Sequence, residues 1–211
     1  MGGDPVRVGL VSNLARPGGN ITGVTNLNVV VAPKRLELLH ELVPNARVMA
    51  LLVDPTEQTS AETTTRDVQA VARGFGLELH ILNASSQHDF DAAFANLEQL
   101  RAGGLVIGAS ALFISLAPRL AALAVRYAVP TAFETREFAA AGGLLSYSGN
   151  LTDSYRLAGI YTARILKGEK PGDLPVQQGT KAELYINLKT AKALGITVPL
   201  PLSGRADELI E

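Results

Sequence analysis

Residues Arg47 to Val53 constrain the fold of this chain more than any other segment. They read Arg-Val-Met-Ala-Leu-Leu-Val and are followed directly by Asp54-Pro55, which is a turn signal. A continuous apolar run of this length is typical of a strand buried on both faces, as in a parallel sheet that helices cover. The segment therefore favours an α/β fold.

Further strand-like segments follow through the middle of the chain. Segments with the pattern of strands alternate with segments in which apolar residues recur at helical spacing. This alternation predicts a parallel sheet that is covered on both faces by right-handed crossovers. We expect strands at 47–53, 77–82, 105–108, 130–133 and 143–147, with helices at 57–75, 90–100 and 118–127 between them.

The two flanks of the chain follow a different pattern. The first residues run directly into turn and helix material, so we expect a fold that began earlier than Met1. Pro33 suits the first turn of a helix that starts at Ala32, and Asn187 and Gly195 are residue types that begin and end a short helix. The remaining expected elements are a short helix at 6–14, an extended piece at 21–24 and a long helix at 152–167.

Composition excludes several classes of function. The 211 residues carry a formal net charge of −1 and no basic run exceeds two residues, so we expect no nucleic-acid partner. The chain has no cysteine, which rules out disulfides, thiolate catalysis and Cys-based metal sites. The longest apolar stretches are too short and too broken to cross a bilayer, and we find no export signal in the sequence.

The sequence predicts no catalytic residue, no metal site and no cofactor. His40, His80 and His88 form no His-x-x-x-His pair, and cysteine is absent, so a zinc site is not expected. Gly103-Gly104 and Gly142-Gly143 precede strands, whereas a phosphate cradle needs glycines after a strand and before a helix. No Gly-x-Ser-x-Gly nucleophile elbow occurs either.

Polar residues collect where the predicted strands end. In open parallel sheets, ligands bind outside this edge, and hydroxyl, amide and carboxylate groups suit a small polar molecule. The same residue types also cap helices, so the pattern alone leaves both interpretations open. The groups concerned are Asp54 to Glu57, Asn83 to Ser86, Ser110, Glu134 to Glu137, and Ser146 to Asn150.

Several short segments carry a resemblance to a known family. They are residues 3–6 (Gly-Asp-Pro-Val), 16–24 (Arg-Pro-Gly-Gly-Asn-Ile-Thr-Gly-Val), 34–39 (Lys-Arg-Leu-Glu-Leu-Leu), 54–57 (Asp-Pro-Thr-Glu), 142–147 (Gly-Gly-Leu-Leu-Ser-Tyr), 165–171 (Ile-Leu-Lys-Gly-Glu-Lys-Pro), and 186–191 with 194–196. In this order they resemble the substrate-binding proteins of ABC transporters whose better-known members bind tryptophan and related aromatic amino acids. The resemblance spans essentially the whole chain.

The resemblance implies a periplasmic-binding-protein type I fold, with two Rossmann-like lobes joined by three crossings. Such proteins normally start with an export signal and the first strands of lobe one, which we expect to be missing here. Exposed apolar faces and strand edges would then favour self-association into a homodimer. The expected parts are a lobe-one remnant at 1–25, a complete five-stranded lobe two at 26–150, a lobe-one helix and crossover at 151–180, and a C-terminal hinge and strand-helix segment at 181–211.

The resemblance also implies ligand capture without chemistry. A small polar or aromatic solute that contacts both lobes favours the closed state, and a membrane permease reads that state. Such proteins act in the periplasm or elsewhere outside the cytoplasm. Asp54 stands where the family usually has Asn, which bears on the identity of the ligand. The expected ligand contacts are Asp54, Thr56, Glu57, Ser110, Glu134, Ser148 and Asn150.

Two other functions stay open at this point. A small α/β enzyme would use Glu57 or Glu134 as a general base, although the scarcity of histidine argues against this. A cytoplasmic ligand sensor is the second alternative, because the same fold serves regulators, but we find no DNA-binding or signalling module in the sequence. The resemblance favours the binding protein over both.

Overall fold

The computed structural model describes residues 5–6, 8–25, 31–179 and 182–211, and it divides the chain into two compact units. Unit 1 comprises residues 1–28 and 149–182, whereas unit 2 comprises residues 29–148 and 183–211. The chain therefore leaves unit 2 directly after Ser148.

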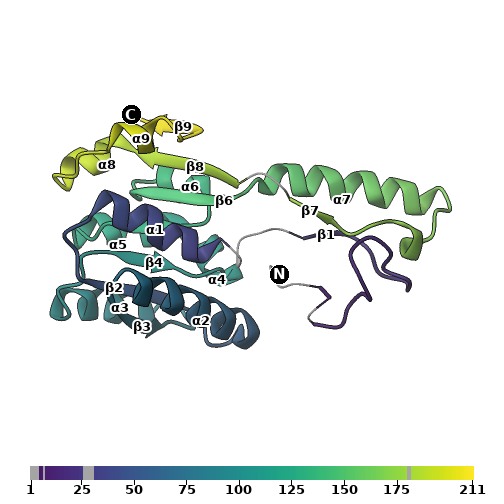
Figure 1. Ribbon diagram of the computed structural model, residues 1–211, viewed down its shortest axis with the longest axis horizontal. Helices are drawn as coiled ribbons and strands as arrows, with labels where there is room; N and C mark the ends of the chain where they lie inside the picture. Colours follow the sequence, from purple (N-terminus) through teal and green to yellow (C-terminus); the bar gives the residue numbers. More distant parts are fainter. Residues whose placement is uncertain (1–4, 7, 26–30, 180–181) are drawn as a thin grey trace. The chain divides into compact units, whose positions relative to one another are not determined.

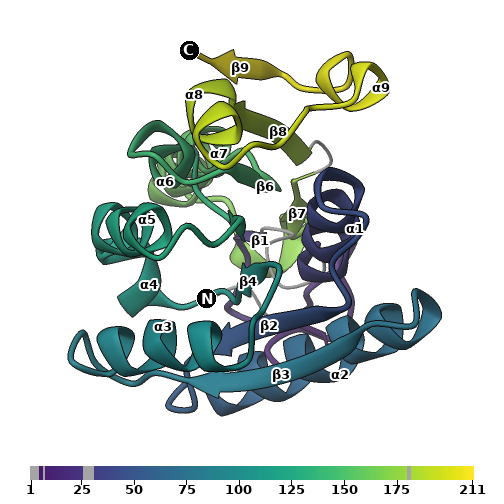
Figure 2. The same ribbon diagram turned by 90° about the vertical axis from the view of Figure 1, so that its left-hand side faces the viewer.

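Unit 2 is built on a mixed, mostly parallel sheet, which has seven strands in the described part of the chain (Figure 2). The strand order is β3-β2-β4-β5-β6-β8-β9, so the apolar strand that constrained the fold lies inside the sheet. The bounds are β2 (Val48–Val53), β3 (Glu78–Asn83), β4 (Leu105–Ile107), β5 (Thr131–Phe133), β6 (Leu145–Gly149), β8 (Ala182–Asn187) and β9 (Glu208–Ile210).

The pairing within this sheet is parallel along most of its width. β2 pairs in parallel with β3 and with β4, and the pairs β4–β5, β5–β6 and β8–β9 are parallel as well. The Asn187 N–H donates to the Leu144 carbonyl at 2.9 Å, which sets the end of β8 beside the start of β6. These two strands therefore run in opposite directions. The predicted α/β class with a parallel sheet is confirmed.

Helices cover both faces of the sheet and form two apolar cores with it. Met49, Leu51 and Val53 of β2 belong to one core, and Ala50 and Leu52 belong to the other. A strand that supplies both cores must be apolar throughout, as the sequence of β2 is. The first core is completed by α1 (Ala32–Leu42), α2 (Gln58–Gly74), α8 (Leu188–Ala193) and α9 (Leu200–Ser203), and the second by α3 (Asp89–Gln99), α4 (Ala111–Ser115), α5 (Ala117–Arg126) and α6 (Arg136–Ala140).

Unit 1 is assembled from two segments that are far apart in the sequence, residues 1–28 and residues 149–182 (Figure 1). Its strands pair in parallel, and its long helix contacts the first of them. The Thr22 hydroxyl donates to the Leu174 carbonyl at 2.7 Å, and the Leu14 carbonyl accepts from the Val176 N–H at 2.7 Å. These bonds join the two segments. The elements are β1 (Val24–Thr25), α7 (Leu151–Leu166), the 3₁₀ turn η1 (Pro171–Asp173) and β7 (Gln177–Gln178).

Some expected elements are absent or differ. The helix expected at 6–14 is wrong, because the described residues there form turns in which the Pro5 carbonyl accepts from the Leu10 N–H. Gly9, with a φ of 73°, stands in the left-handed region and interrupts a right-handed helix. The sheet has seven strands in the described residues rather than five, since β8 and β9 extend it. No helix in the described ranges is both long and apolar enough to cross a membrane.

Candidate functional site

The candidate site lies at the carboxyl ends of β2 and β4, which are neighbours in the sheet. Leu52 is paired with Ile107, so the two strands end side by side. Asp54 follows β2 and Ser110 follows β4 by a few residues. The Ser110 hydroxyl donates to Asp54 Oδ2 at 2.8 Å, and both residues are buried. Two of the polar residues that follow predicted strands, Asp54 and Ser110, are therefore in direct contact.

Asp54 also organises its own loop. Its Oδ1 accepts from the Thr56 backbone N–H at 2.9 Å and from the Thr56 hydroxyl at 2.6 Å. The two oxygens thus accept three hydrogen bonds in all, whereas an ionised carboxylate has room for about four. These three bonds therefore leave about one acceptor position of the carboxylate over.

Glu57 joins the same two loops at a second point. Its Oε1 accepts from the Ala111 backbone N–H at 2.9 Å, at the start of α4. Ser110 caps that helix, because its hydroxyl oxygen accepts from the Leu112 N–H at 3.1 Å. We refer to Asp54, Thr56, Glu57 and Ser110 as the strand-end cluster. It offers carboxylate and hydroxyl oxygens that suit a ligand carrying hydrogen-bond donors, an ammonium group included.

Glu134 belongs to a different arrangement. It follows β5 and is buried, and its Oε2 lies 3.5 Å from Nη2 of Arg35 in α1. Arg35 is also buried, and its Nε donates to the Tyr147 carbonyl at 2.8 Å. Burial lowers the pKa of Arg35 to about 10, while the nearby Glu134 carboxylate acts in the opposite direction. The guanidinium therefore stays charged at neutral pH, opposite a carboxylate in the interior.

The last two expected contacts lie on either side of the exit from unit 2. Ser148 is buried in β6 and is the last residue of unit 2 before the chain leaves it. Asn150 belongs to unit 1, where its Oδ1 accepts from the Asp153 N–H at 2.8 Å and caps α7. The structure thus groups four of the seven expected residues in the strand-end cluster and places Glu134, Ser148 and Asn150 elsewhere.

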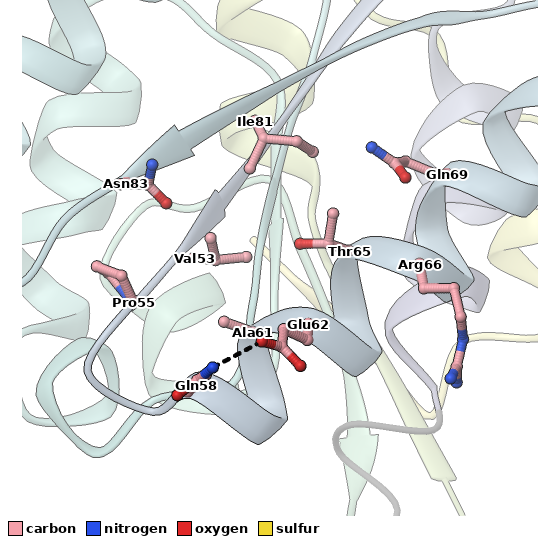
Figure 3. A pocket seen from close by; sticks show the side chains of 10 residues that line it. All are labelled: Val53, Pro55, Gln58, Ala61, Glu62, Thr65, Arg66, Gln69, Ile81 and Asn83. Carbon is pink, nitrogen blue, oxygen red and sulfur yellow. Dashed lines mark hydrogen bonds between the residues drawn. The ribbon is translucent and has the colours of Figure 1, made fainter.

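A groove lies between the ends of β2 and β3 and helix α2 (Figure 3), and its lining residues Pro55 and Gln58 are sequence neighbours of the strand-end cluster. It has a volume of about 460 Å³ and is open to solvent. Val53 at the end of β2 and Ile81 within β3 supply apolar lining, and residues of α2 form one wall. The remaining lining residues are Pro55, Gln58, Ala61, Glu62, Thr65, Arg66, Gln69 and Asn83.

The part of the chain that the structure describes contains no candidate metal site. No group of three or more His, Asp or Glu side chains there is close enough to hold an ion. The two carboxylates that we considered as general bases are both engaged, Glu57 by a backbone N–H and Glu134 by Arg35.

Sequence reasoning overlooked Arg35, which we quoted only within a family segment. A signal was present in the spacing. Arg35 follows Ala32 by three positions and precedes Leu39 and Leu42 by four and seven, which is the spacing of one helix face. All four residues are buried in α1. A charged residue within an apolar stripe indicates a buried partner, and that partner is Glu134.

Comparison with known proteins gives one matching family model and a curated relative. The model of the family described as "ABC transporter substrate binding protein" matches residues 1–210. A tyrosine-binding protein of Clostridioides difficile is 27% identical over 194 residues, which cover 90% of this chain and 54% of that protein. The chain thus spans about half the length of this curated relative.

Solved structures give the same result. A domain from Streptococcus pneumoniae in complex with L-Trp has a TM-score of 0.84 and 26% identity, over 98% of this chain and 70% of that one. A conserved domain protein from Vibrio cholerae has a TM-score of 0.85 and 25% identity, over 98% of this chain and 68% of that one. The resemblance in the sequence and the type I periplasmic-binding-protein fold are confirmed. This chain belongs to the ABC transporter substrate binding protein family.

Proposed function

We propose that this chain is the ligand-binding part of an extracytoplasmic substrate-binding protein, which captures an aromatic amino acid for an ABC importer. The single observation that carries the proposal is the family match over residues 1–210. The choice of ligand is supported by two relatives, of which one is named as tyrosine-binding and the other was solved with L-Trp.

The strand-end cluster is the part of unit 2 that we assign to ligand contact. Asp54 and Glu57 supply carboxylate oxygens, and Thr56 supplies a hydroxyl on the exposed side of the same loop. An amino acid carries an ammonium group, and a charge-assisted bond to a carboxylate is roughly twice as strong as a neutral one. We assign the ammonium to Asp54 or Glu57, and we retain Ser148 and Asn150 as further contacts near the exit from unit 2.

Capture needs no covalent step. A ligand that binds one arrangement of the protein better than another shifts the population toward the first, by as much as the two affinities differ. A permease that recognises the ligand-bound arrangement then responds to the ligand without contacting it directly. We therefore assign no catalytic residue, and the partner of the chain is a membrane permease.

A ligand screen tests this function. The full chain is heated with L-tryptophan, L-tyrosine, L-phenylalanine or L-leucine, and its melting temperature is followed. We expect tryptophan or tyrosine to raise it, by mass action on the folded state, and leucine to leave it unchanged. Mass spectrometry of the recovered ligand checks the second half of the proposal. An amino acid recovered with altered mass after incubation would show turnover and contradict capture without chemistry.

A further inference from the structure

The buried pair Arg35–Glu134 ties together three parts of unit 2 that are far apart in the sequence. Arg35 lies in α1, the first helix of unit 2, and Glu134 follows β5. The guanidinium donates to the Tyr147 carbonyl at 2.8 Å, and Tyr147 stands in β6 directly before Ser148, after which the chain leaves unit 2. One side chain therefore connects the beginning of unit 2 to its exit.

Stability alone does not account for a charged pair at this place. Removing two charges from water is costly, and replacing a buried ion pair by apolar residues of similar volume is often neutral or stabilising. Leu36 and Leu39 beside Arg35 show that this part of α1 accommodates aliphatic side chains without exposure. What an apolar residue cannot do is hold a backbone carbonyl and a carboxylate in fixed directions.

The bond to the Tyr147 carbonyl acts on the strand that carries Ser148. The Tyr147 carbonyl of β6 accepts from Arg35 Nε, and the residues on either side of it, Ser146 and Ser148, are buried. A carbonyl that accepts from one N–H of a buried, rigid guanidinium restricts the end of the strand. Restricting a contact segment before binding lowers the entropy lost when the ligand binds.

We propose that Arg35 is a positioning residue, which uses Glu134 as its partner and fixes the end of β6 in the place that ligand binding requires. This assignment rests on the proposed function, and it adds a role for Glu134 to that function. Glu134 is assigned to Arg35 rather than to the ligand, so the ammonium group is left to Asp54 or Glu57.

The test compares two double variants of the full chain. Arg35→Met with Glu134→Leu removes the buried pair, whereas Arg136→Met with Glu208→Leu removes an exposed pair that α6 forms with β9. Hydrogen exchange is measured for the peptides that cover β6 and β2, and affinity is measured by calorimetry with L-tryptophan or L-tyrosine. We expect the buried double variant to keep slow exchange in β2, to exchange faster in β6 and to bind about tenfold more weakly. The exposed double variant should match the parent in all three respects.

Three results would overturn the proposal. They are an unchanged affinity in the buried double variant, unchanged exchange in β6, and faster exchange in β2 as well as β6, which would show general destabilisation. Glu134→Gln separates the two roles of this side chain, because it keeps an acceptor oxygen for Arg35 but loses the charge. We expect its affinity to stay within about threefold of the parent. A loss of about tenfold or more with slow exchange in β6 would mean that the carboxylate contacts the ligand.

Failure of the proposed function would be visible separately. If the parent binds neither amino acid, the exchange measurement still decides whether Arg35 fixes the end of β6. Faster exchange confined to β6 supports the positioning role in that case, and exchange equal to that of the parent overturns it.

Discussion

The Ser110 hydroxyl donates a hydrogen bond of 2.8 Å to Asp54 Oδ2, and this bond joins two loops whose residues are 56 positions apart in the sequence. The bond is buried, and it holds the loop after β4 against the loop after β2. Because Ser110 also caps α4, one hydroxyl serves both as a donor to the cluster and as an acceptor for the helix.

Ser110→Ala should lower the stability of unit 2. The variant leaves Asp54 Oδ2 without this donor and the Leu112 N–H without its cap, and we expect a loss of about 1–2 kcal/mol. Urea denaturation measures the loss. Ser115→Ala is the matched control, since Ser115 lies exposed in the same helix and donates only to the Leu112 carbonyl. Equal effects of the two substitutions would contradict the role given to Ser110.

Arg35→Met alone should be far more harmful than the double variant Arg35→Met with Glu134→Leu. The single substitution leaves a buried carboxylate without the guanidinium, and we expect it to cost about 3–5 kcal/mol. The second substitution should restore most of this loss, because no charge then remains at the site. Denaturation of the two variants and of Glu134→Leu gives the coupling energy of the pair. Additive losses would contradict the account of a coupled pair.

Much of the central sheet of unit 2 was predictable from the sequence because its strands supply two cores at once. The apolar run at 47–53 is typical of a strand covered on both faces, and β2 is found at Val48–Val53. The helix expected at 152–167 is confirmed as α7, since Asn150 caps it at one end and Gly168 follows it.

The remaining elements depend on contacts with residues that are distant in the sequence, which a local sequence pattern does not reveal. β9 has three residues, and its strand character comes from pairing with β8 rather than from its own composition. The Arg35–Glu134 pair joins residues that are distant in the sequence, so neither residue alone signals it. Of the strand-end residues, the pattern located Asp54, Glu57 and Ser110 at one edge, but it gave no means of separating Glu134 from them.

Gly143→Ala should destabilise unit 2, and Gly159→Ala should not harm the chain. A Cβ at Gly143 would clash with the ring of Phe138, which is buried, so we expect a loss of about 1–3 kcal/mol. A Cβ at Gly159 in α7 meets no atom within 4 Å, and alanine is there favoured over glycine by about 0.5–1 kcal/mol. Thermal melting of both variants checks the pair. A stable Gly143→Ala variant would show that Phe138 can move aside.

The carboxylate of Asp89 should contribute to acid unfolding. Its Oδ2 accepts from the backbone N–H groups of Ser85 and Ser86, each at 2.8 Å, and these bonds hold the pKa of Asp89 below its usual 3.8. The folded state thus binds fewer protons than the unfolded one. The contribution is present above that usual pKa, which applies to the unfolded chain, and is lost as the pH falls through the lower folded value.

Denaturation of Asp89→Asn between neutral and strongly acidic pH measures this contribution. We expect the stability of the variant to fall less steeply with acid than that of the parent. Asp91→Asn serves as the comparison, because Asp91 lies in the same helix and pairs with the exposed side chain of Arg119. Identical slopes for the parent and Asp89→Asn would contradict the assignment.

Calorimetric titration of the full chain with L-tryptophan and L-tyrosine tests the central claim most directly. We expect saturable binding of at least one of them with a stoichiometry of one, and an affinity about tenfold or more lower in the double variant Asp54→Asn with Glu57→Gln, which removes both carboxylates of the cluster. Asp91→Asn should bind as the parent does. Absence of saturable binding of either amino acid at millimolar concentration, or equal affinities of the parent and the double variant Asp54→Asn with Glu57→Gln, would contradict capture of an aromatic amino acid by the strand-end cluster.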